Sequence, residues 1–204
     1  MMPLAGLLIA YLAGSIPFAY LAGKLFKGID LREHGSGNLG ATNVFRVMGW
    51  KIASVVMLLD IAKGALPVLL LPPRFAPSQP VLWAIAFGVA AIFGHVKSVF
   101  LLWKGGGKGV ATAGGVFLAL APIPSVISLS VWATVLYLTG YVSLASLTSE
   151  VTLTVAVAIM YGVTSPITIA SAVTTLFVFW THRSNIGRLR RGEENRFRRA
   201  RPAT

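Results

Sequence analysis

The segment 34–46 carries the residue types of an anion site, with three closely spaced glycines among neutral donors. Closely spaced glycines let successive backbone N–H groups converge on an anion, and a helix starting near Thr42 would add the positive end of its dipole. Arg46 adds a guanidinium that binds phosphate through two parallel hydrogen bonds. The neutral donors are Ser36, Asn38, Thr42 and Asn43.

The same glycines, Gly35, Gly37 and Gly40, have the spacing of the dinucleotide-binding fingerprint. That fingerprint requires a preceding strand and a βαβ unit, which an apolar helical chain does not offer. The segment therefore predicts a phosphate site of another kind. A flexible turn between helices, ending in a helix cap, is the alternative that stays open.

A second glycine-rich segment, Gly105–Gly107, is followed directly by Lys108 at an expected helix start. It is not a Walker A loop, because Gly109 stands where that motif needs Ser or Thr. Backbone N–H groups of Gly106 and Gly107 could still approach an anion closely while Lys108 supplies a point charge. A glycine hinge beside topology-determining lysines is the alternative interpretation.

Polar residues near the C-terminus give a weaker signal. His182 and Asn185 share one face if the last apolar helix continues through them, which suits either a polar site or a solvated helix end. Hydroxyls in the turn 139–146, including Ser143, are typical helix caps. The seven arginines between 188 and 201 favour attachment of the tail to anionic lipid.

The composition indicates what must position these residues. The 204-residue chain is 55% hydrophobic and only 12% charged, against about 25% charged in average soluble proteins. Long apolar runs separated by short polar loops predict an all-α, polytopic transmembrane helix bundle. The absence of Cys excludes disulfides and thiolate chemistry, and three His with six acids leave too few ligands for most metal clusters.

Hydropathy predicts about seven spans, each boundary uncertain by several residues, in a single domain of residues 1–204 with a basic cytoplasmic tail at 183–204. Of the 18 Lys and Arg residues, only Arg74 would face outward if the N-terminus is outside and the C-terminus cytoplasmic. The net charge of +12 therefore indicates membrane orientation and anionic substrates rather than nucleic acid. The expected spans are 3–24, 50–72, 80–96, 108–122, 124–140, 143–162 and 166–182.

Charged residues within two of these spans need an explanation. Asp60 and Lys63 lie at i and i+3, which predicts an intrahelical ion pair, with support of the polar site as the alternative. Glu150 has no evident partner nearby in sequence, but its span should turn its polar side toward the bundle interior.

The two glycine loops and the C-terminal polar residues all fall on the expected cytoplasmic side. Together they predict a membrane enzyme that joins a phosphorylated polar molecule to a lipid, with the bundle supplying an apolar groove. A phosphate transporter would place its charged groups nearer the membrane midplane, commonly in repeated halves. A His-x-x-x-x-Asp acyltransferase is excluded by inspection, and a CDP-alcohol phosphotransferase would need more aspartates than the two present.

Several separated motifs closely resemble the bacterial acyl-phosphate:glycerol-3-phosphate acyltransferase family over nearly the whole chain. Ala145 and the extra Gly105 depart from the pattern without removing a chemically committed group. The motifs are Gly-Ser-Gly-Asn-x-Gly-x-Thr-Asn ending in Arg46, Asp60-x-x-Lys63-Gly64, His95 leading to Gly106-Gly107-Lys108-Gly109-Val110-Ala111-Thr112, Tyr141-x-Ser143-Leu144, and His182-Arg183-x-Asn185-Ile186 through Arg188-Leu189 to Gly192-x-Glu194-Asn195.

The resemblance implies transfer of an acyl group from acyl phosphate to the 1-hydroxyl of glycerol 3-phosphate, giving lysophosphatidic acid and phosphate. It implies that Ser36 and the adjacent amides hold the acyl phosphate, and that His182 positions a substrate or relays a proton. Arg46, Lys108, Ser143 and Asn185 would bind glycerol phosphate. The further substrate-binding residues that it implies are Gly37, Asn38, Gly40, Thr42, Asn43, Gly106, Gly107 and Glu194.

The expected partners are these two substrates and membrane lipid. We expect no cofactor, no metal, no nucleic acid and no obligate protein partner. The family pattern also implies a multi-pass protein of the bacterial cytoplasmic (inner) membrane whose active site faces the cytoplasm.

Overall fold

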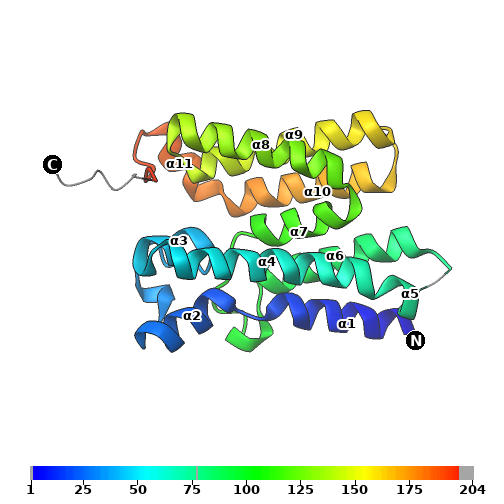
Figure 1. The fold of residues 1–204 in the computed structure, drawn as a ribbon, viewed down its shortest axis with the longest axis horizontal. Helices are drawn as coiled ribbons and strands as arrows, with labels where there is room; N and C mark the ends of the chain where they lie inside the picture. The colour runs from blue at the N-terminus through cyan, green and yellow to red at the C-terminus, as the bar shows by residue number, and fades with distance from the viewer. Residues whose placement is uncertain (1, 77, 198–204) are drawn as a thin grey trace. The chain divides into compact units, whose positions relative to one another are not determined.

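The computed structural model describes residues 2–76 and 78–197, and over these residues the secondary structure is entirely helical. The chain divides into two compact units, residues 1–120 and 121–204. We call them the N-terminal and C-terminal units and describe each by itself (Figure 1). The helical class predicted from composition is confirmed.

The N-terminal unit holds the first glycine-rich segment between helices and the second directly before its last helix. Helix α4 packs against α6 and α7, and α1 packs against α6. The elements are α1 (Met2–Ser15), α2 (Phe18–Lys27), the 3₁₀ turn η1 (Leu31–Glu33), α3 (Ala41–Met48), α4 (Trp50–Leu70), α5 (Pro72–Phe75), α6 (Pro80–Val96), the 3₁₀ turn η2 (Val99–Leu101) and α7 (Val110–Leu120).

Glycines allow these helices to approach closely. A Cβ on Gly14 would collide with the backbone of Ala91, and a Cβ on Gly64 would collide with the carbonyl of Thr112. Small residues at such crossings are typical of helix contacts in membranes, where dispersion contacts between backbones drive association. The glycines therefore fix α1 against α6 and α4 against α7.

The first predicted span, 3–24, is not one continuous helix. It breaks between α1 and α2 at Ile16 and Pro17, because proline removes a backbone donor and its ring disfavours the preceding turn. The break leaves carbonyls without helical partners. Lys63 donates from Nζ to the carbonyl of Ile16 at 2.9 Å, and Ser98 donates from Oγ to the carbonyl of Ser15 at 2.6 Å.

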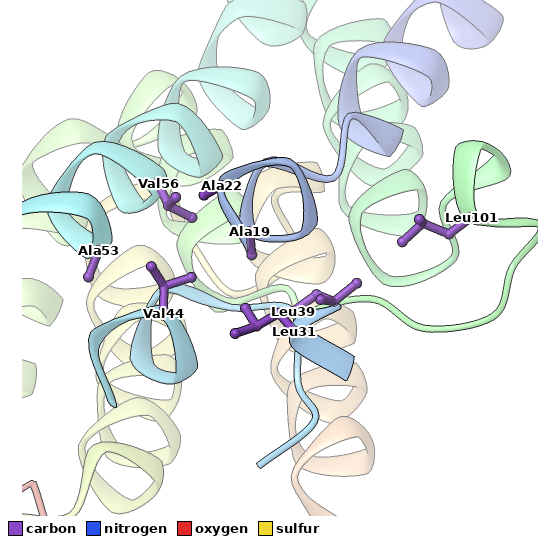
Figure 2. Packing of buried hydrophobic residues seen from close by; sticks show 8 residues of the cluster. All are labelled: Ala19, Ala22, Leu31, Leu39, Val44, Ala53, Val56 and Leu101. Atoms are coloured by element: carbon purple, nitrogen blue, oxygen red, sulfur yellow. The ribbon is translucent and has the colours of Figure 1, made fainter. Parts of the chain in front are cut away.

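A compact apolar core of the N-terminal unit includes residues from the first glycine segment and from the approach to the second (Figure 2). Leu31 and Leu39 come from the first segment and its approach, and Leu101 comes from η2, shortly before the second segment. Their burial restrains both loops in the N-terminal unit. The remaining members of this cluster are Ala19, Ala22, Val44, Ala53 and Val56.

In the C-terminal unit, α9 packs against both α8 and α10. Ser149 and Glu150 of α9 are buried, and Thr154 shares a hydrogen bond of 2.9 Å with Thr175 of α10. The polar side of this span therefore faces the interior of its helix group, as predicted. The elements are α8 (Pro122–Thr139), α9 (Val142–Tyr161), α10 (Pro166–Thr181) and α11 (Arg183–Arg190).

Among the described residues, five helical stretches are long and apolar enough to cross a membrane. The other two predicted spans correspond to α7 and α10, with 11 and 16 residues. At 1.5 Å per residue α7 is about 16 Å long, roughly half of the hydrocarbon thickness. The last arginines of the predicted basic tail, within 198–204, lie outside the described residues.

Candidate active site

The two glycine-rich segments meet in the N-terminal unit. The backbone N–H of Leu39 donates to the carbonyl of Gly106 at 3.3 Å, and Arg32 donates from Nη1 to the carbonyl of Lys104 at 2.9 Å. Sequence reasoning placed both segments on one membrane face, and the structure joins them into one double loop. We call residues 30–43 and 104–109 together the double loop.

Arg32 is the side chain that ties the two halves of the double loop together. Asp30 holds its guanidinium through an ion pair of 2.6 Å, and the guanidinium also lies 5.3 Å from the ring centroid of Tyr20. The hydrogen bond from Arg32 lowers the pKa of Asp30 to about 2, so this pair stays charged at neutral pH. Sequence reasoning counted Arg32 only as a topology signal, because its partner carbonyl lies 72 positions away.

Asn43 holds the first half of the double loop in shape. Its Oδ1 accepts from the backbone N–H of Ser36 at 2.9 Å, while its Nδ2 donates to the carbonyl of His34 at 2.9 Å. Gly35 has a φ of +63°, where a side chain is strained, and a Cβ there would strike Asn43. The amide of Asn43 is thus engaged with its own loop.

Ser36 and Arg46 are exposed, and Lys108 is partly exposed, separated by one residue from the start of α7 at Val110. Helix α3 begins at Ala41, which confirms the predicted helix start near Thr42. The N-terminal unit thus presents the hydroxyl of Ser36 and the cations of Arg46 and Lys108 from its glycine-rich region. The other residues predicted here are partly exposed, namely Gly37, Asn38, Gly40, Thr42 and Gly106, whereas Gly107 is buried.

In the C-terminal unit, three side chains converge on Glu194. Its Oε1 accepts from Ser143 at 2.8 Å and from Asn185 at 2.6 Å, and its Oε2 accepts from Arg188 at 2.7 Å. Burial would raise the pKa of Glu194, but these hydrogen bonds outweigh it and hold the pKa below its usual value. The cluster gathers predicted site residues from α9, α11 and the segment after α11.

His182 lies at the junction of α10 and α11, where the helix is interrupted. The interruption is confined to His182, because α11 begins at Arg183 and the backbone N–H of Ile186 donates to the carbonyl of His182 at 2.9 Å. The ring is buried, and its Nδ1 lies 2.9 Å from the carbonyl of Val178. Because a carbonyl only accepts, Nδ1 carries the hydrogen, and in the neutral ring Nε2 is then the basic nitrogen.

The segment after α11 folds back on the turn between α8 and α9. Arg196 donates from Nε to the hydroxyl of Tyr141 at 3.0 Å, and the backbone N–H of Phe197 donates to the carbonyl of Gly140 at 2.6 Å. Sequence reasoning assigned the arginines of this segment to lipid attachment. The spacing of these arginines in the sequence does not indicate that Arg196 contacts Tyr141.

Each unit therefore supplies groups suited to a phosphate ester. The N-terminal unit offers Ser36, Arg46 and Lys108, and the C-terminal unit offers the imidazole of His182 and the hydrogen-bonded cluster around Glu194. Over residues 2–76 and 78–197, no group of three or more His, Asp or Glu side chains is placed to hold a metal ion.

Comparison with known proteins shows the family to which the chain belongs. The profile of the glycerol-3-phosphate acyltransferase family matches residues 4–192. Curated glycerol-3-phosphate acyltransferases resemble the chain closely. The one from Bacillus velezensis is 46% identical over 90% of this chain and 91% of the relative, and the one from Geotalea daltonii is 43% identical over 93% and 95%.

Two solved structures of PlsY (YgiH), an integral membrane glycerol 3-phosphate acyltransferase, share the fold. The glycerol 3-phosphate form superposes with a TM-score of 0.89 at 37% identity, covering 97% of this chain and 96% of that chain. The lysophosphatidic acid form gives a TM-score of 0.84 at 36% identity, covering 96% and 95%. With its apolar helices, the chain is an integral membrane protein, and it belongs to the glycerol-3-phosphate acyltransferase family.

Proposed function

We propose that the protein transfers a fatty acyl group from acyl phosphate to the 1-hydroxyl of glycerol 3-phosphate, releasing lysophosphatidic acid and inorganic phosphate. The observation that supports the proposal is the double loop, in which the backbone N–H of Leu39 donates to the carbonyl of Gly106 and so joins the segment of Ser36 to the segment of Lys108. Such a site suits this reaction, because the acyl donor and the acyl acceptor both carry a phosphate group.

Acyl phosphate is a mixed anhydride with a good leaving group, so no protein nucleophile is required. The hydroxyl oxygen of glycerol 3-phosphate attacks the acyl carbonyl carbon, and the bond from that carbon to the phosphate oxygen breaks. The hydroxyl proton leaves with the departing phosphate, or through the basic Nε2 of His182. The Ser36 hydroxyl donates a hydrogen bond to the acyl phosphate and to the developing oxyanion, while the backbone N–H groups of Ser36 and Gly37 stay bonded to Asn43 and to the carbonyl of His34.

Charge recognition follows from the two cations of the N-terminal unit. Arg46 offers a planar fork for a phosphate, and Lys108 offers a compact charge at the start of α7. Ser143 and Asn185 serve glycerol phosphate in this proposal. Because a carboxylate repels phosphate, Glu194 acts by fixing those two side chains through its hydrogen bonds.

The proposed setting is the bacterial inner membrane, with seven membrane segments, the N-terminus outside and the active site facing the cytoplasm. The support is the distribution of Lys and Arg, 16 of which fall in or beside the inward loops of that arrangement. This arrangement counts the short helices α7 and α10 as membrane segments, although neither has the length of a full crossing.

The donor is tested by giving purified protein acyl phosphate, acyl-CoA and acyl-carrier protein separately, each with glycerol 3-phosphate. We expect lysophosphatidic acid and one equivalent of inorganic phosphate from acyl phosphate alone. Product from acyl-CoA alone would overturn the donor assignment. NMR of the glycerol protons identifies the acylated position, because esterification shifts the protons of the acylated carbon downfield.

A further inference from the structure

A buried polar network connects the membrane-spanning helix α4 with the double loop. Asp60 and Lys63 form the predicted i, i+3 ion pair, at 2.7 Å between Nζ and Oδ1. The Nδ1 atom of His95, at the end of α6, lies 3.6 Å from the same Oδ1. That distance is longer than a hydrogen bond and is an electrostatic contact. All three side chains are at most 7% exposed.

The other side of His95 faces the second glycine segment. The backbone N–H of Gly107 donates to the carbonyl of His95 at 3.3 Å. A Cβ added to Gly107 would collide with Nε2 of the His95 ring, and one added to Gly106 would collide with the carbonyl of Val96. The loop therefore passes directly over the end of α6, and the ring edge sets how close Gly107 approaches.

We propose that His95 is a positioning residue, which transmits the fixed geometry of the Asp60–Lys63 pair to Gly107 and so holds Lys108 and the loop amides ready for phosphate. The inference rests on the proposed role of this loop in binding a substrate phosphate. His95 itself contacts neither substrate in this account. It acts through the loop that it supports.

An imidazole can be oriented by a neighbouring carboxylate, whereas an apolar side chain cannot. The χ2 rotation of histidine is soft, so packing alone leaves the ring angle poorly defined. The carboxylate of Asp60 on one edge gives the ring a preferred orientation. Lys63 is held in turn by the carbonyl of Ile16 at 2.9 Å and lies 5.3 Å from the ring centroid of Phe18. The network thus joins the break between α1 and α2 to the glycine loop.

A double-mutant cycle between His95 and Gly107 tests the contact. Gly107 does not need a positive φ, so Gly107→Ala acts through its collision with the ring rather than through backbone strain. We expect His95→Ala and Gly107→Ala each to raise the KM for glycerol 3-phosphate about tenfold, with a smaller change in kcat. Removing the ring makes room for the added methyl group. The double variant should therefore stay near tenfold instead of reaching about a hundredfold, the product of independent effects.

A buried hydrogen bond elsewhere supplies the control for general loss of stability. Ser128 donates to the carbonyl of Ser149 at 2.7 Å within the C-terminal unit, so Ser128→Ala should lower the unfolding temperature while leaving KM unchanged. His95→Gln is the second variant should His95→Ala not fold. It keeps a polar group of similar reach and should give an intermediate KM.

Two readouts separate this inference from the proposed function. Binding of glycerol 3-phosphate is measured without a donor, as the rise in unfolding temperature that the ligand causes. Hydrogen exchange of the segment 104–109 in ligand-free protein should be faster in His95→Ala and unchanged in Ser128→Ala. Wild-type protein that fails to turn over acyl phosphate contradicts the proposed function, whereas faster exchange in His95→Ala still supports the positioning role. Multiplicative KM effects, or unchanged exchange at 104–109, would overturn it.

Discussion

The side-chain oxygen of Asn43 accepts a hydrogen bond of 2.9 Å from the backbone N–H of Ser36, seven positions earlier in the chain. The same amide group donates to the carbonyl of His34. Ser36 is exposed and Asn43 is buried, so a buried side chain fixes the backbone of the residue proposed to touch the donor.

Asn43→Asp should damage both stability and activity. The substitution keeps the acceptor for Ser36 but replaces the Nδ2 donor by an oxygen that faces the carbonyl of His34. An unsatisfied buried group costs about 1–3 kcal/mol, and more when charged. We expect a lower unfolding temperature in detergent and at least a tenfold loss of kcat/KM. Asn195→Asp makes the same chemical change at an exposed position and should leave both near wild type. Equal behaviour of the two variants would contradict the role of Asn43.

The Glu194 cluster predicts a specific dependence of stability on pH. The pKa of Glu194 is lower in the folded protein than its ordinary value. The carboxylate therefore contributes stability that is fully present above the ordinary pKa of about 4.3 and is lost as the pH falls through the lowered folded value. Hydrogen bonds to a charged group contribute about 1.5–3 kcal/mol each.

Glu194→Gln should thus be less stable than wild type at pH 7, and the difference should shrink as the pH falls below about 4. Glu193→Gln is the matched control, because Glu193 forms an exposed ion pair with Arg191 and such pairs contribute about 0–1 kcal/mol. Unfolding temperatures of the three proteins between pH 7 and pH 3.5 measure the effect. A constant gap between wild type and Glu194→Gln would show that the carboxylate charge does not matter.

Hydropathy predicted the helices well because it reports a property of contiguous residues. The expected span 80–96 coincides with α6 (Pro80–Val96), and 50–72 contains α4 (Trp50–Leu70). The break in the first span was missed, although Pro17 marks it in the sequence. Two consecutive apolar helices have the same hydropathy as one continuous helix. The residue that donates to the carbonyl of Ile16 at the break, Lys63, lies 47 positions away in the sequence.

The candidate site was predicted as residue types rather than as an arrangement. Glycine spacing and cations indicated both loops, since these features are local. The contacts that shape the loops were not predictable from spacing. Arg32 reaches the carbonyl of Lys104, and Asn43 bonds the backbone of its own loop instead of pointing outward. Side-chain to backbone hydrogen bonds of this kind have no complementary residue type to signal them.

Arg46→Lys tests whether the charge or the shape of Arg46 matters. Lysine keeps the positive charge that a topology signal needs, but it cannot form the two parallel hydrogen bonds of a bidentate phosphate contact. Loss of one charge-assisted hydrogen bond costs about 1.5–3 kcal/mol, which corresponds to roughly ten- to a hundredfold. We expect that loss in kcat/KM for glycerol 3-phosphate with normal membrane insertion. Arg74→Lys, at an exposed arginine of α5, should behave like wild type. Near-normal kinetics of Arg46→Lys would contradict the bidentate phosphate contact and favour the interpretation of Arg46 as a topology signal.

The role of Ser36 separates direct transfer from covalent catalysis. A nucleophilic serine needs a base that takes its proton and gives an acyl-enzyme with ping-pong kinetics. Acyl phosphate is already an activated mixed anhydride, so the transfer does not require a serine nucleophile. We therefore expect a ternary complex in which the Ser36 hydroxyl donates to the acyl phosphate.

Removal of one such donor typically lowers the rate by about 10²–10³, so Ser36→Ala should fall by that factor while retaining its unfolding temperature. Initial rates of the wild type, measured against both substrates, should give intersecting lines in double-reciprocal plots. Mass spectrometry after incubation with acyl phosphate alone should find Ser36 unmodified. Parallel lines together with an acylated Ser36 would make it the nucleophile, and the proton would then have to pass to a base that approaches the exposed hydroxyl.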